Sequence, residues 1–262
     1  MISSRQNQRV KDIRRLRRSK GDLALLEGPH LVAEALAAGL ALESVLATPP
    51  FLDSPEGRRL AGLLAVEPLT VSPDLLAELT DADSPRGILA VALLPRSGAA
   101  SLPVAPGRPY LYLDGLQDPG NLGALARVAE AAGAAGLALS SGCVHPNHPR
   151  ALRASAGSLL RLPVAVGAEP DALDAHLALA LPRWAALVPR DGEDLYRADL
   201  AGTLILALGA EGPGLSPLLL DRAGLRLTIP MAAAVESLNA TVAAALVLFE
   251  MRRRETIPTV FS

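Results

Sequence analysis

The chain has 262 residues, half of them apolar and only 3% aromatic, which is enough to bury one large core or two of ordinary size. Its one cysteine, Cys143, excludes an internal disulfide, and its polar, basic first residues predict no signal peptide. The longest apolar stretch, residues 240–249, is too short to span a bilayer, which takes about 20 residues. We therefore expect a soluble, cytoplasmic protein with no membrane contact.

Charge is unevenly distributed along the chain although the net charge is only −2. Residues 1–20 carry eight basic side chains and one acidic one, whereas residues 21–95 carry three basic and eleven acidic ones. A basic arm on an acidic module indicates contact with nucleic acid, although a solvated helix face would show the same charges. Of the 25 basic residues 23 are arginines, whose guanidinium suits phosphates, but a GC-rich genome explains that excess more simply.

The first 95 residues alternate predicted strands and helices, as a small α/β module does. Residues 5–18 place apolar side chains three apart among Arg and Lys, which predicts a helix with a narrow apolar stripe and a broad basic surface. The remaining helices are expected at 29–38 and 73–79, and strands at 23–27, 44–47, 65–71 and 88–93.

A segment rich in proline and glycine, residues 96–108, predicts a linker between two domains, 1–95 and 109–262. The α/β alternation then resumes, and in an open parallel sheet ligands bind where the strands end. The loops after the strands are therefore the expected site. Strands are predicted at 110–114, 137–140, 204–208 and 225–229, and helices at 123–132 and 237–254.

The first of three notable loops follows the strand that ends at Asp114. Asn121 suits the N-cap of the next helix, because its side-chain oxygen can accept from an early backbone N–H. Arg127 lies about one and a half turns further on, among apolar neighbours, and we expect it to need a partner. A well-capped structural helix would also explain this segment.

The second loop, residues 208–215, holds three glycines, which let a backbone come close to a ligand or to another strand. It matches neither a P-loop nor the dinucleotide-binding pattern. Glu211 is the unusual residue, since a turn does not require an acid there.

The third loop runs from Ile229 through Met231 into the last helix. Ser237 can cap that helix, whereas Asn239 is poorly explained as a structural residue because Asn disfavours helix interiors.

Taken together and in order, the three loops resemble the motifs of SpoU-type (TrmH-type) RNA ribose methyltransferases. The motifs are N-x-G-x-x-x-R from Asn121, G-x-E-G-x-G-L from Gly209, and I-P-M followed by S-L-N-A-T-V-A-A-A. The resemblance covers residues 110–254. R-x-S-x-G at 153–157 fits as well, and so do L-E-G-P-H at 26–30 and S-P-R-G-I-L-A-V at 84–91 in the first domain.

This resemblance implies a C-terminal SPOUT domain, an α/β fold with a parallel sheet and a deep trefoil knot, preceded by a small α/β RNA-binding domain. It implies methyl transfer from S-adenosylmethionine to a ribose 2′-hydroxyl in structured RNA, with 23S rRNA favoured over tRNA. It also implies a homodimer through the catalytic domain. The predicted last helix is apolar over much of its circumference, so it needs burial on more than one face, and a partner subunit could cover one of them. Its apolar residues are one stripe of Leu238, Val242, Leu246 and Phe249, which Ala243, Val247 and Met251 extend.

The resemblance assigns residues to three tasks, and no metal to any of them. Arg127 would clamp the phosphate and the developing oxyanion rather than act as a base, because a guanidinium group is a poor proton acceptor. The expected catalytic residues are Asn121, Arg127, Glu211, Ser237 and Asn239. Those expected to bind the methyl donor are Gly209, Gly214, Ile229, Met231 and Leu238. Those expected to bind RNA are Arg9, Lys11, Arg14, Arg15, Arg17 and Arg18.

Other functions fit the sequence less well. A non-catalytic ribosome-assembly factor would first lose Asn121, Arg127, Glu211 or Asn239, and all four are present. A nucleotide-dependent metabolic enzyme would explain the glycine turns but not the basic first helix. A metal site at Cys143, His145 and His148 matches no zinc spacing.

Overall fold

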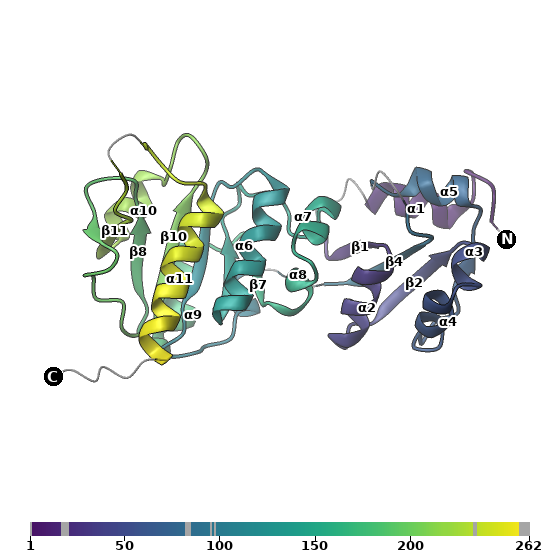
Figure 1. The fold of residues 1–262 in the computed structure, drawn as a ribbon, viewed down its shortest axis with the longest axis horizontal. Coiled ribbons are helices and arrows are strands. Elements are labelled where there is room, and N and C mark those ends of the chain that lie inside the picture. The colour runs from purple at the N-terminus through teal and green to yellow at the C-terminus, as the bar shows by residue number, and fades with distance from the viewer. Residues whose placement is uncertain are drawn as a thin grey trace. The chain divides into compact units, whose positions relative to one another are not determined.

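A computed structural model describes residues 2–16, 21–81, 85–94, 96, 98–232 and 235–256 (Figure 1). The chain forms two compact units. The first comprises Met1–Pro95 and His145–Arg161, and the second comprises Arg96–Val144 and Leu162–Ser262. Both are mixed α/β structures, as predicted. Within the described ranges, no helix is both long enough and apolar enough to cross a membrane.

The first unit is built on a four-stranded sheet whose order is β1-β4-β2-β3. β4 pairs antiparallel with β1 and β2, and β3 runs parallel to β2. Val10 and Ile13, the predicted apolar stripe of the first helix, are buried in the core beside this sheet. The strands are β1 (Leu23–Glu27), β2 (Leu42–Ala47), β3 (Leu69–Thr70) and β4 (Ile88–Leu93), and the helices are α1 (Gln8–Leu16), α2 (Pro29–Ala37), α3 (Pro49–Leu52), α4 (Pro55–Ala61) and α5 (Pro73–Leu79).

A segment from the middle of the chain, His145–Arg161, packs with the first unit, although the sequence interpretation placed it in the second domain. It contains α7 (Pro149–Ala154) and α8 (Ser158–Arg161). Arg153, the arginine of the R-x-S-x-G pattern, forms an ion pair with Glu27, whose side chain is only 2% exposed. Arg161 pairs in the same way with Glu34 of α2. Arg153 of this pattern therefore anchors the segment to β1, and Arg161, which follows the pattern, anchors it to α2.

The second unit contains a seven-stranded sheet in the order β7-β6-β5-β10-β8-β11-β9. Every pair of neighbouring strands is parallel, which confirms the predicted parallel sheet. In chain order the strands are β5 (Tyr110–Asp114), β6 (Gly136–Leu139), β7 (Val164–Val166), β8 (Arg183–Leu187), β9 (Glu193–Asp194), β10 (Leu204–Gly209) and β11 (Leu225–Thr228).

Helices cover both faces of this sheet. α6 (Pro119–Ala132) and α11 (Ala240–Thr256) lie side by side on one face (Figure 1). On the other face, side chains of α9 (Pro170–Leu177) and α10 (Pro217–Arg222) join the core that contains Tyr112 and Trp184.

The segment predicted as a linker falls, as far as the structure describes it, within the second unit. It includes the short 3-10 helix η1 (Ala99–Ser101), and Leu102 is buried in the core beside the sheet. The backbone N–H of Gly107 donates to the side chain of Thr203 at 2.8 Å. Proline and glycine interrupt the regular structure in this segment without detaching it from the sheet.

Candidate active site

The site lies where the order of the strands reverses. From β5 the chain builds outward through β6 to β7, and β10 then pairs with the other edge of β5. The last residues of the two central strands, Asp114 and Gly209, are register partners. Loops that leave parallel strands at such a switch point diverge and leave room for a ligand between them. The first and second loops of the sequence analysis are these two loops.

The first loop enters α6 through a cap formed by Asp118. The backbone N–H of Asn121 donates to Oδ1 of Asp118 at 2.7 Å, and Pro119 takes the first helical position. The prediction that Asn121 is the N-cap is therefore wrong. Because Asp118 satisfies this end of the helix, the amide side chain of Asn121, in the first turn, is available for other contacts.

The second loop closes tightly on itself. Gly214 donates its backbone N–H to the carbonyl of Ala210 at 3.0 Å. Gly212 and Gly214 have φ of +96° and +72°, a region that favours glycine. A Cβ on Gly209 would lie 2.0 Å from the carbonyl carbon of Gly214. The close approach expected of these glycines is thus between two parts of the same loop.

Asp114 fixes the far end of the second loop. Its Oδ2 accepts the backbone N–H of Ser216, the residue before α10, at 2.9 Å. The aspartate that ends the strand before the first loop therefore holds the second loop in place.

The third loop ends at Asn239, which is the residue that caps α11. Its Oδ1 accepts the backbone N–H of Thr241 at 2.9 Å, and its carbonyl accepts that of Ala243. The prediction that Ser237 caps this helix is wrong, because the helix begins three residues later, at Ala240. Asn239 thus precedes the helix, which removes the conflict with its low helix propensity.

Three predicted catalytic residues, one from each loop, meet in a hydrogen-bonded chain. Asn121 donates from Nδ2 to Oε1 of Glu211 at 2.7 Å. Asn239 donates from Nδ2 to Oδ1 of Asn121 at 3.5 Å, a long contact. Since a carboxylate only accepts, Glu211 fixes which end of the Asn121 amide faces Asn239. Glu211 and Asn239 lie 90 and 118 residues after Asn121 along the chain, so this cluster is made by the fold.

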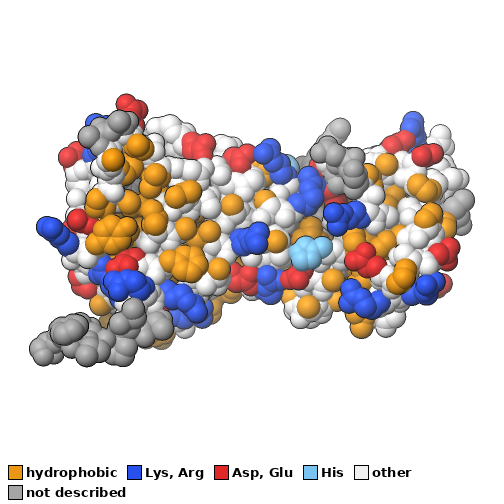
Figure 2. Space-filling model, viewed as in Figure 1, with side chains coloured by type: hydrophobic (Ala, Val, Ile, Leu, Met, Phe, Trp, Pro, Cys, Tyr) orange, Lys and Arg blue, Asp and Glu red, His pale blue; other side chains and the backbone are white. Residues whose placement is uncertain are grey.

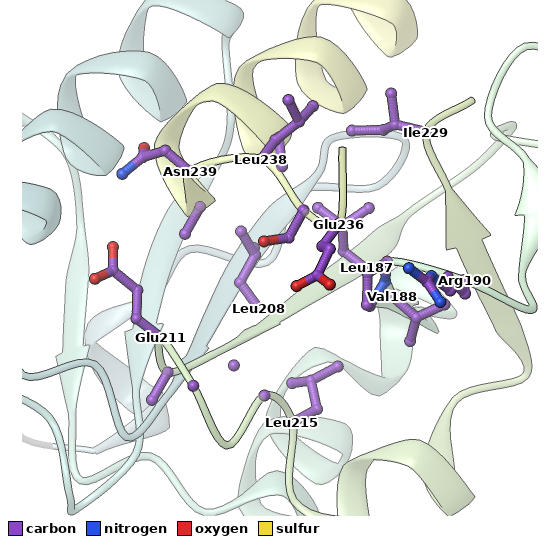
Figure 3. A pocket seen from close by; sticks show the side chains of 18 of the residues that line it. Leu187, Val188, Arg190, Leu208, Glu211, Leu215, Ile229, Glu236, Leu238 and Asn239 are labelled. Carbon is purple, nitrogen blue, oxygen red and sulfur yellow. The ribbon is translucent and has the colours of Figure 1, made fainter. Parts of the chain in front are cut away.

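Beside the cluster lies a cavity of about 920 Å³ (Figure 3). All five residues predicted to bind the methyl donor line it, and so do Glu211, Ser237 and Asn239. Leu208, Ile229 and Leu238 give it an apolar lining beside the backbone of the second loop.

The sequence interpretation missed one wall of this cavity, residues 187–190, and it missed Glu236. Leu187 is the last residue of β8, and residues 188–190 follow it. The sequence interpretation did not predict β8. The available signal was the apolar run 184–188 ahead of a proline, an arginine and a glycine, the pattern of a buried strand and its loop.

Arg127 is neither in the cluster nor in the cavity lining. Its side chain is exposed on α6, while Leu125, Ala126 and Ala129 on other sides of the helix are buried. Within the described part of the chain it has no hydrogen bond or ion pair, so the partner expected for it is not there. Because its guanidinium faces solvent, it needs none.

The predicted RNA-binding arm is only partly described. Arg9, Lys11 and Arg15 are exposed on α1, whereas Arg14 is half-buried and pairs with Glu78 of α5 at 2.8 Å. Arg17 and Arg18 lie outside the described residues. Within the ranges that the structure covers, no three His, Cys, Asp or Glu side chains gather as a metal site would require.

Comparison with known proteins gives consistent matches over both units. The sequence model of the SpoU rRNA methylase family matches residues 108–249, and that of the MRM3-like substrate-binding domain matches residues 7–90. An uncharacterized tRNA/rRNA methyltransferase of Synechocystis is 36% identical, over 97% of this chain and 94% of its own. The 23S rRNA guanosine 2′-O-methyltransferase RlmP of Bacillus subtilis is 30% identical, over 96% and 98%. The crystal structure of the SpoU methyltransferase AviRb from Streptomyces viridochromogenes, with its cofactor AdoMet, is 27% identical and superimposes with a TM-score of 0.88, over 96% of this chain and 99% of that one.

Together with the switch-point site, these relatives define an RNA ribose methyltransferase that uses S-adenosylmethionine. The chain belongs to the SpoU rRNA methylase family, as its three motifs predicted.

Proposed function

We propose that this protein methylates a ribose 2′-hydroxyl of 23S rRNA, with the methyl donor in the cavity and the target ribose at the Asn121–Glu211–Asn239 cluster. The observation that carries the proposal is that motifs from three distant parts of the chain meet beside one cavity. The rRNA substrate is supported by two relatives whose names specify 23S rRNA: RlmP of Bacillus subtilis and a uridine 2′-O-methyltransferase of Streptomyces viridochromogenes. They match over 96% and 92% of this chain, the first unit included. Methylation of tRNA is the alternative.

The chemistry of the cavity lining suits S-adenosylmethionine. The donor's adenosine part is neutral and has no phosphate, so it suits apolar side chains and backbone groups more than a phosphate-binding cradle. Leu208, Ile229 and Leu238 supply the apolar contacts, and Gly209 and Gly214 bring backbone close. When bound, the donor supplies a methyl group on a positively charged sulfur.

In the proposed reaction the 2′-oxygen attacks the methyl carbon as the carbon–sulfur bond breaks, and the bonding electrons remain on sulfur. The protein must place that oxygen in line with the methyl group and stabilise the charge that develops on it. The cluster would hold the ribose, since Glu211 keeps one carboxylate oxygen outside its bond to Asn121. Ser237 would add a hydroxyl at the cavity wall.

Arg127 would grip the phosphate next to the target ribose and stabilise the oxyanion. It is an exposed cation in the same helix as Asn121, and in the described part of the chain nothing neutralises it. A guanidinium does not take up a proton at neutral pH, so the phosphate or a water molecule would accept the proton. No step in this reaction needs a metal.

The trefoil knot is also part of the proposal. Its support is that β10 inserts between two strands that precede it in the chain, β5 and β8, and that the third loop then returns to line the cavity beside the second. The second and third loops would form the knot.

The first unit would bind the RNA, with α1 as its basic arm. The match to a substrate-binding domain over residues 7–90 supports this assignment, and so do the exposed Arg9, Lys11 and Arg15. RlmP of Bacillus subtilis modifies 23S rRNA, which bacteria assemble into ribosomes in the cytoplasm, and we propose the same location for this protein.

The protein would form a homodimer through α11. Val242, Leu246 and Phe249 on this helix are 48%, 38% and 47% exposed, and Tyr196 beside them is 56% exposed. Figure 2 shows the hydrophobic side chains gathered on this face. We call these four residues the α11 patch.

The test of the proposed function is to identify which RNA is methylated and whether the methyl group lies on the ribose. Purified protein and S-adenosylmethionine carrying a labelled methyl group are incubated with unmodified 23S rRNA or with total tRNA, and the product nucleosides are identified by mass spectrometry. We expect one 2′-O-methylated nucleoside from 23S rRNA and none from tRNA. Label on a base, or on tRNA alone, would contradict the proposal.

A further inference from the structure

Two side chains of opposite charge line the cavity but belong to none of the three motifs: Arg190 and Glu236. Arg190 lies in the loop after β8, and Glu236 lies in the third loop. In Figure 3 Arg190 and Glu211 are on opposite sides of the cavity, and the Arg190 guanidinium points inward, toward the side on which Glu236 lies. Within the described ranges neither group has a hydrogen bond or an ion pair.

The methyl donor has one part whose charges match this pair. Its adenosine part is neutral, but its amino-acid part carries an α-carboxylate and an α-ammonium group. A planar guanidinium binds a carboxylate with two parallel hydrogen bonds, and a carboxylate accepts from an ammonium group. The apolar lining around Leu208, Ile229 and Leu238 would instead disfavour charged groups.

We propose that Arg190 and Glu236 form the subsite for the amino-acid end of the donor, with Arg190 on the carboxylate and Glu236 on the ammonium group. This proposal rests on the proposed function. It places the neutral adenosine against the apolar wall and leaves the methyl group to face the Asn121–Glu211–Asn239 cluster. Arg190 and Glu236 are then positioning residues, since they hold the donor at a part that does not react.

A pair of ligands that differ only by the amino-acid part can test this. S-adenosylhomocysteine keeps that part, whereas methylthioadenosine lacks it. The dissociation constants of both are measured by calorimetry for the wild-type chain, for Arg190→Gln and for Glu236→Gln. Arg197→Gln is the matched control, because Arg197 is an exposed arginine of the same unit that does not line the cavity.

We expect each cavity variant to bind S-adenosylhomocysteine roughly 10- to 100-fold more weakly, the scale of one lost charged hydrogen bond, and to bind methylthioadenosine as the wild type does. The control should change neither constant. Both side chains are exposed, so the melting temperature in the absence of ligand should stay the same. Equal losses for both ligands, or no loss for either, would overturn the subsite. A wild-type chain that binds neither ligand would overturn the proposed function itself.

Discussion

Arg127 lies on the exposed side of an otherwise well-buried helix, and in the part of the chain that the structure describes it forms no ion pair. α6 buries Leu122, Leu125, Ala126 and Ala129 on its other sides, so the arginine adds little to the packing of the fold. Exposed substitutions of this kind usually change stability by less than about 0.5 kcal/mol. A role in the reaction can therefore be separated from a role in folding.

Replacing Arg127 with Ala should lower the rate of methyl transfer roughly 100- to 1000-fold, the scale of losing one group that stabilises an oxyanion. The melting temperature and the affinity for S-adenosylhomocysteine should stay near those of the wild type. Arg127→Lys should restore little activity, because an ammonium group lacks the planar two-pronged grip. Single-turnover methylation measures the rate, and near-wild-type turnover of Arg127→Ala would rule out the clamp.

The sequence indicated which loops carry the site, but it did not settle the role of each polar residue within them. Asp118 and Asn121 are both good N-caps, as are Ser237 and Asn239, and propensity alone does not choose between them. In the first loop, Pro119 should have decided the matter, because proline favours the position directly after the cap. Contacts such as Asn121 with Glu211 depend on the pairing of β5 with β10, which no local pattern contains.

The shape of the cavity depends on how the second loop folds back on β10. A side chain at Gly209 would collide with the backbone of Gly214 and Leu215, and backbone atoms cannot rotate away as a flexible side chain can. The loop must therefore move if Gly209 gains a Cβ. Because the same loop lines the cavity, we expect the donor to lose contacts.

Gly209→Ala should weaken S-adenosylhomocysteine binding by roughly tenfold or more, equivalent to at least about 1.4 kcal/mol. The matched control is Gly224→Ala in the same unit, where a Cβ would meet no atom within 4 Å and φ is not positive. Calorimetry on both variants compares them directly. Unchanged affinity in Gly209→Ala would show that the loop can shift without affecting the donor site.

Several strongly patterned elements were predicted with their observed bounds, whereas other elements of similar length were missed. β1, β4, β5 and α5 have the expected bounds, whereas β7, β8, β9, α3 and α4 were missed and β3 is shorter than predicted. Alanine explains part of this, since β8 has the sequence R-W-A-A-L and alanine is uncommon in strands. Buried alanines such as Ala185 and Ala186 fill the narrow space between sheet and helices, so tertiary packing overrides their propensity.

The α11 patch is an exposed apolar surface, and we propose that a second copy of the chain covers it. α11 buries Ala244, Val247 and Leu248 against its own unit and exposes a second apolar side to solvent. Beside the patch, hydrogen bonds from Arg253 and then Arg254 lower the pKa of Glu250 to about 2, so this carboxylate is charged at neutral pH. An apolar centre with a charged rim is typical of a protein interface.

Leu246→Asp should convert a dimer into a monomer at micromolar concentration, because the partner would have to bury an unpaired carboxylate. Leu179→Asp is the control, since Leu179 is 87% exposed and lies outside the patch. Sedimentation equilibrium gives the mass of each variant. A wild-type chain that sediments as a monomer would refute the dimer, and a dimeric Leu246→Asp would place the interface elsewhere.

The segment His145–Arg161 limits how the two units can be separated or exchanged in the gene. Because it belongs to the first unit while its flanking sequences belong to the second, the polypeptide passes between the units three times, and a gene cut at residue 95 does not separate them. A shortened gene starting at residue 96 would encode Arg153 and Arg161 without Glu27 and Glu34, and it would expose Ala151 and Leu152, which are now buried. Recombination that exchanges the first unit between relatives would have to exchange this internal segment as well, so the two parts are expected to be inherited together.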